Sequence, residues 1–381
     1  MASKLECAAS VPHQSNPPIF IHSLPRVGST WLGYKFADCP NVAYRFEPFH
    51  ENLIAGTPAS LQEAFEKLRF GMSLRHPVRT DHYHKNYSFR PEGGAAHFQK
   101  RFCFENYCLD PFDVDDDLRT YFANLLAEAS KGHRTPIIKS TKSPFRANWL
   151  SKYFQGVHLY IFRNPRLMDN SHFSFHGYSN PYIRDYSLII GQNGHHAILQ
   201  GLARWSGLDR FVSESLKEEY AYYNRVLSQE NRRKYDRQYH FDCLCFFWVL
   251  ALAQATTYAD LIIDMDMLGQ EEIRLQIETQ IKRLTGLVID LSDHHVSNTR
   301  VGTIMRRHRL VVSREMEAII RRAVARVRPD WERLRQFYLT EETEDVIRLF
   351  GAESRILGNT RRSKRVENSR RSAWHYVFSP K

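Results

Sequence analysis

The stretch Pro18-Ile-Phe-Ile-His-Ser-Leu24, followed by Pro25-Arg-Val-Gly-Ser-Thr-Trp-Leu32, decides the fold class. An apolar run of strand length passes into a turn with glycine and hydroxyl residues, and the turn leads into a helical pattern. The first N–H groups of a helix have no partner within the helix and attract anions. The stretch therefore predicts a strand, an anion-binding loop and a helix in succession.

Two further apolar runs repeat this order. Pro136-Ile-Ile138 is followed by the polar segment Lys139-Ser-Thr-Lys142. Val157-His-Leu-Tyr-Ile-Phe162 is followed by Arg163-Asn-Pro-Arg166, and Ala259–Met265 is a fourth candidate strand. Strands that alternate with helices are typical of a parallel sheet. We predict an α/β fold in which helices flank an open parallel sheet, with a helical extension near the C-terminus.

Composition divides the chain into one large domain with appendages. We predict a flexible N-terminus over residues 1–17, a main domain over 18–356 and a basic tail over 357–381. Within the domain, residues 71–112 are rich in His, Tyr, Phe and Gly and show no clean period, so we interpret them as an insertion or long loop. The helical extension is predicted over 301–356.

The composition also excludes several classes of protein. With 381 residues, 43% hydrophobic and 25% charged, the chain is neither intrinsically disordered nor collagen-like nor a disulfide-stapled miniprotein. Six scattered cysteines without a CxxC pair indicate reduced, mostly buried thiols. The N-terminal residues lack an apolar signal region, and the run Cys243–Ala253 is too short to span a bilayer and predicts a buried helix. We therefore expect a cytoplasmic protein.

The formal net charge of +11 comes from two segments. Residues 301–335 hold ten Arg against four acids, and 357–381 hold seven Lys or Arg against one acid, so each contributes +6 and the remainder sums to −1. A basic tail can contact anionic lipid or another polyanion. A non-enzymatic polyanion binder is accordingly one alternative function, although we expect no nucleic-acid partner.

The loop after the first strand combines groups that bind a phosphate. Gly28 allows the backbone to approach closely, Ser29 and Thr30 add hydroxyl donors, and Arg26 adds a fixed cation with several donors. The loop is not a Walker A motif, because the GxxxxGK[ST] spacing and its lysine are missing. A phosphate-handling enzyme of the kinase type nevertheless remains a second alternative.

The loop after the third run offers a second phosphate site. Arg163 follows a strand, and Ser171 lies eight residues later at the position where a following helix brings both side chains to one ligand. Open parallel sheets bind ligands at the carboxyl ends of their strands, so both loops are expected to face one crevice.

Together the two loops resemble the sulfotransferases that use 3′-phosphoadenosine 5′-phosphosulfate (PAPS). Pro25 to Leu32 is similar to their 5′-phosphosulfate loop, and Ile161-Phe-Arg-Asn-Pro-Arg166 with Ser171 is similar to their 3′-phosphate motif. The resemblance implies a P-loop-like sulfotransferase domain over residues 18–356, with PAPS as co-substrate and no metal. It also implies the donor-binding residues, which are Arg26, Gly28, Ser29, Thr30 and Trp31 for the 5′-phosphosulfate, Arg163 and Ser171 for the 3′-phosphate, and Arg300 and Gly302 in a loosely similar late basic loop.

The middle run departs from the cytosolic members of this family. Ile137-Ile-Lys-Ser-Thr141 resembles their IIKTH segment, but Thr141 stands where their basic His would be, while Lys139 is retained and can stabilise developing charge. Phe46-Glu-Pro-Phe-His50 resembles the acidic segment of carbohydrate-type members, in which a Glu deprotonates the acceptor. We therefore predict Glu47 as the base, with His50 as the alternative, and a carbohydrate or glycolipid acceptor bound over Glu47, Lys139 and residues 71–112.

We expect no metal site. Three histidine pairs lack Cys or acidic partners at ligand spacing; they are His82/His84, His195/His196 and His294/His295.

Overall fold

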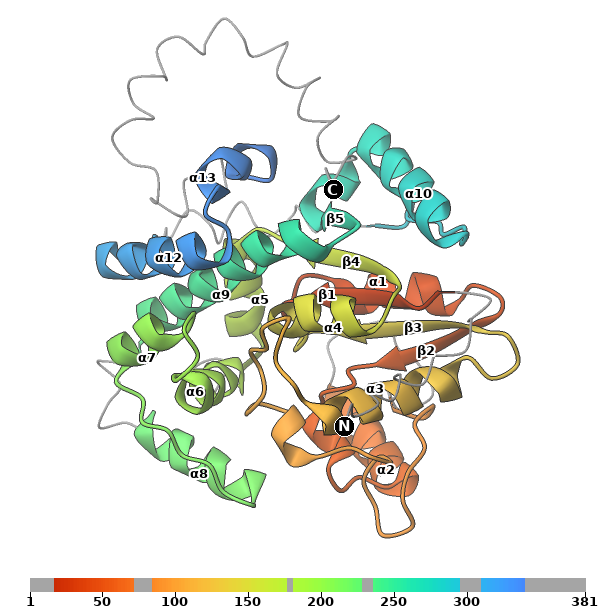
Figure 1. Cartoon of the computed structure of the whole chain (residues 1–381), viewed down its shortest axis with the longest axis horizontal. Coiled ribbons are helices and arrows are strands. Elements are labelled where there is room, and N and C mark those ends of the chain that lie inside the picture. The colour runs from red at the N-terminus through yellow and green to blue at the C-terminus, as the bar shows by residue number, and fades with distance from the viewer. Residues whose placement is uncertain (1–16, 72–83, 177–180, 228–235, 295–309, 340–381) are drawn as a thin grey trace, which may run out of the picture.

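The computed structural model describes residues 17–71, 84–176, 181–227, 236–294 and 310–339 (Figure 1). Its centre is a sheet of five parallel strands in the order β2-β3-β1-β4-β5. The strands are β1 (Ile19–Ser23), β2 (Val42–Phe46), β3 (Thr135–Ser140), β4 (Val157–Phe162) and β5 (Leu261–Asp264). The predicted α/β class with an open parallel sheet is therefore confirmed.

Four of the strands lie where the sequence predicts them, but β2 was not predicted. In β2 the buried side chains are Ala43 and Arg45, whereas Val42, Tyr44 and Phe46 are only half-buried. The strand lies at the edge of the sheet, where it pairs only with β3. A strand at the edge of a sheet is less completely buried and needs fewer apolar side chains. The sequence of β2 therefore shows no clear alternation of apolar and polar residues that would predict a strand.

Helices cover both faces of the sheet, and every residue of β1 and β3 is therefore buried. The α-helices are α1 (Ser29–Ala37), α2 (Pro58–Gly71), α3 (Asp116–Ala129), α4 (Ala147–Tyr153), α5 (Pro165–His176), α6 (Pro181–Asn193), α7 (Gln200–Ser206), α8 (Leu216–Val226), α9 (Arg237–Tyr258), α10 (Glu271–Thr285), α12 (Arg314–Val327) and α13 (Trp331–Leu334). Short 3₁₀ helices are η1 (Glu51–Leu53), η2 (Lys100–Phe102), η3 (Pro144–Arg146), η6 (Met265–Gly269) and η7 (Arg335–Phe337).

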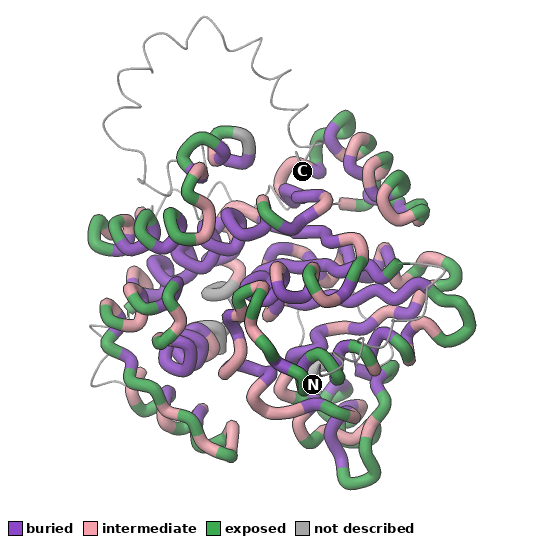
Figure 2. The backbone as a smooth tube through the Cα atoms, viewed as in Figure 1, coloured by how far each residue is buried: buried purple, intermediate pink, exposed green. Residues whose placement is uncertain are grey.

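The long helix α9 is the buried helix that the run Cys243–Ala253 predicts. Asp236 caps it by accepting a hydrogen bond from the Tyr239 N–H at 2.9 Å. Among the described residues α9 alone is long and apolar enough to cross a membrane, but 89% of its apolar window is buried inside the protein. Residues 239–255 of α9 are all buried, as the purple stretch in Figure 2 shows, and the helix contacts both β4 and α12.

The described part of the C-terminal extension is helical. Ser313 caps α12 by accepting a hydrogen bond from Met316 N at 3.3 Å. Met316, Ile319 and Ile320 are buried. The arginines on the remaining faces are exposed; they are Arg314, Arg321, Arg322 and Arg326. Residues 301–309 and 340–356 of the predicted extension lie outside the described residues, as do the N-terminal residues 1–16 and the whole tail 357–381.

The segment that the sequence marks as an insertion belongs partly to the core. Residues 72–83 lie outside the described residues. Beyond them the chain holds only turns, an isolated bridge between Phe89 and Ala95, and η2. Its side chains Phe102, Phe104 and Tyr107 are nevertheless fully buried.

The cysteines match their predicted state where the structure describes them. Cys103, Cys108, Cys243 and Cys245 are buried free thiols, and Cys39 is a half-buried one. Burial raises the pKa of the Cys103 thiol to about 12, so this thiol stays protonated.

Candidate active site

The carboxyl edge of the sheet gathers most of the predicted site residues. The register pairs Ser23 with Ile161 and Phe46 with Lys139, so the five strands end beside one another. In strand order the edge carries Glu47 after β2, Lys139 and Thr141 at the end of β3, Arg26 after β1, Arg163 after β4 and Asp266 after β5.

The loop after β1 adopts a conformation that favours glycine. Gly28 is the N-cap of α1 with a φ of 94°, and a Cβ there would lie 3.0 Å from Met265 Cε. Arg26 also has a positive φ of 69°, which is uncommon for a non-glycine residue. Helix α1 begins at Ser29, so its first N–H groups face this loop. Ser29 is buried and Thr30 is half-buried.

A hydrogen bond joins the two predicted phosphate motifs. Arg26 Nε donates to Ser171 Oγ at 2.9 Å, although the two residues are 145 positions apart. Arg26 follows β1 and Ser171 lies on α5, which follows β4, and these strands are neighbours in the sheet. The two motifs therefore lie beside each other at the carboxyl edge of the sheet.

Arg163 and the following residue, Asn164, are held in place by three hydrogen bonds. Its Nε donates to Asp266 Oδ1 at 2.9 Å, and the N–H of Asn164 donates to Asp266 Oδ2 at 2.7 Å. The indole Nε1 of Trp248 on α9 donates to the Arg163 carbonyl at 2.7 Å. Both the side chain and the backbone of Arg163 are thus fixed.

Glu47 and Lys139 form a buried ion pair. Lys139 Nζ lies 2.5 Å from Glu47 Oε1, and both residues are almost inaccessible to solvent. Thr141 donates its hydroxyl to Oε1 and its N–H to Oε2, each at 2.9 Å. Thr141 therefore contacts the residue that we predict to take over the role of the missing histidine.

These contacts keep Glu47 ionised. Burial alone would raise its pKa, but the charge of Lys139 and the hydrogen bonds from Lys139 and Thr141 hold the pKa below its ordinary value. A carboxylate has about four acceptor positions, of which three are occupied here. The remaining position, on Oε2, can accept a proton.

His50 is less suited to act as a base. It is the N-cap of η1, and its Nδ1 accepts a hydrogen bond from Asn52 N at 3.1 Å. A neutral imidazole whose Nδ1 accepts a hydrogen bond carries its proton on Nε2. Such a ring has no free lone pair with which to take the proton of a substrate hydroxyl.

The other predicted donor residues lie apart from these contacts or outside the described residues. The Trp31 ring packs edge-on against His294 at 5.0 Å between centroids, with the Lys35 ammonium 5.7 Å from it. Arg300 and Gly302 lie in the range 295–309, outside the described residues.

Sequence reasoning did not assign three charged residues of this edge. Lys142 pairs with Glu51 at 2.8 Å, and Lys142 also lies 3.9 Å from the centre of the Phe104 ring. Asp266 pairs with Arg163. Asp266 directly follows the fourth predicted strand, and this position was the available signal for it, whereas nothing in the sequence places Glu51 beside Lys142.

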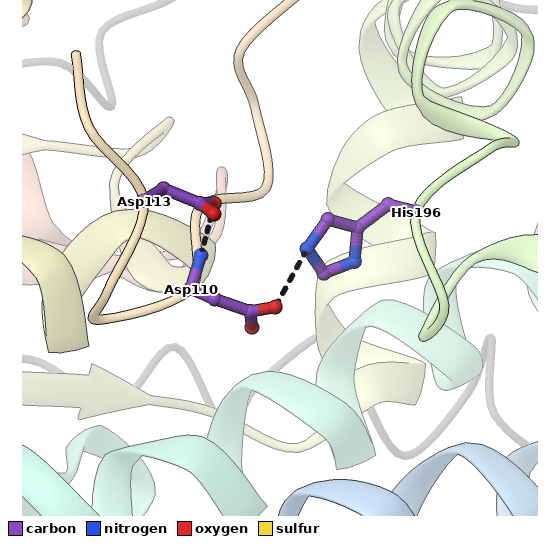
Figure 3. A group of neighbouring side chains, drawn as sticks. All are labelled: Asp110, Asp113 and His196. Carbon is purple, nitrogen blue, oxygen red and sulfur yellow. Dashed lines mark hydrogen bonds and ion pairs between the residues drawn. The ribbon is translucent and has the colours of Figure 1, made fainter.

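A second polar cluster lies elsewhere in the fold (Figure 3). Asp110, Asp113 and His196 have ligand-type atoms within 4.8 Å of one another, so His196 does have acidic neighbours in space. Asp113 Oδ2 accepts a hydrogen bond from Asp110 N at 2.7 Å, and Asp110 is 66% exposed. Asp113 and His196 line an open polar cavity of about 550 Å³. The predicted catalytic and donor-binding residues do not contribute to it, whereas residues of the predicted acceptor segment 71–112, such as Arg101 and Asn106, do. We assign no ligand to this cluster.

Comparison with known proteins adds no relative: no protein-family model, curated protein or solved structure matches the chain.

Proposed function

We propose that the chain is a PAPS-dependent sulfotransferase with a P-loop-like sulfotransferase fold. The observation that carries this proposal is the hydrogen bond between Arg26 and Ser171, which links two loops that resemble the two phosphate motifs of that family. A nucleotide with phosphates at both the 5′ and 3′ positions needs two anion sites in one crevice. The strand order brings these loops together at the carboxyl edge, between β1 and β4.

The loop after β1 supplies the 5′ site in this proposal. The N–H groups at the start of α1 and the Arg26 guanidinium would hold the 5′-phosphosulfate, with hydroxyl donors from Ser29 and Thr30. Arg163 and Ser171 would hold the 3′-phosphate. Both sites are built from backbone amides and arginines, so donor binding in this proposal does not depend on a metal.

The transfer is an in-line displacement at sulfur. The acceptor oxygen forms a bond to sulfur while the bond from sulfur to the 5′-phosphate oxygen breaks, and adenosine 3′,5′-bisphosphate leaves. Glu47 takes the proton of the acceptor hydroxyl, and nothing is oxidised or reduced. Arg26 stabilises the charge that develops on the leaving oxygen, and Lys139 stabilises charge near the acceptor.

A carbohydrate or glycolipid hydroxyl is the acceptor that the proposal favours. It rests on the resemblance of Phe46-Glu-Pro-Phe-His50 to carbohydrate-type members and on the ion-paired, ionised state of Glu47. A cytoplasmic location is part of the same proposal.

Thermal unfolding of the full chain tests the donor site. We expect adenosine 3′,5′-bisphosphate to raise the melting temperature more than ATP or AMP at equal concentration, because a ligand stabilises the state that binds it. Arg163→Ala should abolish this preference. Arg119→Ala is a matched control, because Arg119 is a half-exposed surface arginine paired with Asp116.

Equal or greater stabilisation by ATP would contradict the proposal and would favour a kinase-type phosphate-handling enzyme. A loss of the preference in Arg119→Ala as well would show that the effect follows general charge and not the predicted site.

A further inference from the structure

The ends of β4 and β5 bring an acidic residue to the predicted 3′-phosphate site. Phe162 pairs with Asp264 in the sheet register, so the residues just beyond these two face each other. Asp266 uses one oxygen for Arg163 Nε and the other for the N–H of Asn164. One carboxylate therefore holds both the side chain of Arg163 and the start of the following turn.

This contact leaves the terminal edge of the guanidinium available. Within the part of the chain that the structure describes, neither Nη nitrogen of Arg163 makes a hydrogen bond, and the side chain is 23% exposed. The guanidinium is a rigid planar fork, so fixing Nε fixes the plane in which both Nη groups point. The hydrogen bond from Trp248 Nε1 to the Arg163 carbonyl also restrains the backbone at this residue.

We propose that Asp266 is a positioning residue that presents the two Nη groups of Arg163 to the 3′-phosphate, and thereby makes the site discriminate adenosine 3′,5′-bisphosphate from adenosine 5′-phosphate. This inference rests on the proposed function, because it takes Arg163 to bind the 3′-phosphate.

The negative charge of Asp266 also opposes the binding of an anion. Its side chain is 23% exposed, so solvent screens this repulsion, whereas the orientation of the guanidinium acts directly on two charge-assisted hydrogen bonds. Burial and the charge of Asp266 raise the pKa of the adjacent Asp264 to about 8, so Asp264 is largely neutral near pH 7. The site therefore carries one carboxylate charge and not two.

The carboxylate orients Arg163, which favours phosphate binding, and its charge opposes phosphate binding. The substitution Asp266→Asn removes the charge and disturbs the orientation, so the direction of the change in affinity shows which of the two effects is larger. The two donors contact different oxygens of Asp266, and Asn places an NH₂ group, itself a donor, at one of these two positions. The variant can satisfy either Arg163 Nε or Asn164 N, but not both, so the guanidinium loses its fixed plane.

Calorimetric titration of the full chain with adenosine 3′,5′-bisphosphate and with AMP tests the inference. We expect wild type to bind the bisphosphate more tightly, and Asp266→Asn to reduce the ratio of the two affinities by about 10-fold, the range of a charge-assisted hydrogen bond. Affinity for AMP should change little. Asp260→Asn is the matched control, because Asp260 accepts from His158 N at 2.9 Å at the opposite end of the same strand pair. It should leave the ratio unchanged.

A double-mutant cycle shows whether Asp266 acts through Arg163. Once Arg163→Ala has removed the guanidinium, adding Asp266→Asn should have no further effect on the ratio. If Asp266→Asn does not fold, Asp266→Glu decides, since moving the carboxylate by one methylene should lower the ratio several-fold.

Each outcome has one meaning. An unchanged ratio in the Asp266 variants, an equal loss of affinity for both nucleotides, or a further effect of Asp266→Asn on Arg163→Ala overturns the inference while leaving the donor site in place. A wild-type protein without any preference for the bisphosphate defeats the proposed function itself.

Discussion

At the scale of single residues, the proposed transfer depends on the buried pair of Glu47 and Lys139. The pair costs desolvation of two charges, and Thr141 offsets part of this cost with two hydrogen bonds. Glu47 has a positive φ of 49°, so its backbone is held in an unfavourable conformation. Only 5% of Glu47 is exposed, which means that an acceptor hydroxyl has to enter a nearly closed site to reach Oε2.

We predict that Glu47→Gln lowers sulfuryl transfer by about 100-fold or more while donor binding is retained, because a general base contributes that much. Transfer from sulfur-35 PAPS to a set of sugar acceptors measures the rate. His50→Asn keeps the cap of η1 and should retain most of the activity.

The opposite pattern, with activity lost in His50→Asn and kept in Glu47→Gln, would move the base to His50. Since Gln leaves Lys139 buried without its counter-charge, the double variant Glu47→Gln with Lys139→Met serves as a folding control.

Asp264 gives a second prediction, on stability. Its folded pKa is about 8, above the ordinary carboxyl value. Between about pH 4 and pH 8 the unfolded chain has released this proton while the folded chain keeps it, so the free energy of unfolding falls as the pH rises. We expect Asp264→Asn to be more stable than wild type at pH 8 by roughly 5 kcal/mol, the free energy of a pKa shift of this size, and this difference to shrink toward pH 4. Denaturant titrations across this range measure it; a constant difference at every pH would contradict the assignment.

At the scale of elements, the proposed function assigns donor binding to the turn between β1 and α1. We predict that Gly28→Ala costs about 1–2 kcal/mol of stability, because its φ of 94° disfavours a side chain. It should also abolish stabilisation by adenosine 3′,5′-bisphosphate. Gly132→Ala is the matched control, since Gly132 also has a positive φ, of 72°, with open space around it.

Gly132 lies between α3 and β3, before the strand begins and so at the opposite edge of the sheet. Its variant should lose similar stability but keep the nucleotide response, as measured by thermal unfolding with and without ligand. If both variants keep the response, the turn is not the donor site.

The strands show which parts of the fold can be predicted from the sequence. The runs that became β1, β3 and β4 are buried on both faces and therefore read as short apolar runs bounded by turns. The edge strand β2 buries Ala43 and the charged Arg45, so its sequence does not show the apolar pattern that predicts a strand. Glu47 could nevertheless be predicted as a site residue, because the resemblance of its motif does not depend on recognising the strand that positions it.

At the scale of the whole molecule, the charge and the candidate site are separate. The basic excess lies in residues 301–335 and 357–381, whereas the site residues that the structure brings together lie between Arg26 and Asp266. Contacts across the sheet edge, such as Arg163 with Asp266, join residues 103 positions apart. Such pairs depend on strand order, which local sequence patterns do not specify, and this is why Asp266 and the Glu51–Lys142 pair were missed.

We predict that deleting residues 357–381 leaves stabilisation by adenosine 3′,5′-bisphosphate unchanged and weakens binding to a polyanion. Each positive charge removed lowers a salt-dependent attraction. Elution from a heparin column should move to lower salt. A truncated chain that elutes as before, or that no longer responds to the nucleotide, would contradict this separation of charge and site.

The crystal structure of the chain with adenosine 3′,5′-bisphosphate tests most directly whether the two loops form one donor site. We predict the 5′-phosphate against Arg26 and the amides that begin α1, and the 3′-phosphate between the Nη groups of Arg163 and the Ser171 hydroxyl. A nucleotide bound away from the ends of β1 and β4, or with its 3′-phosphate in solvent, would contradict it.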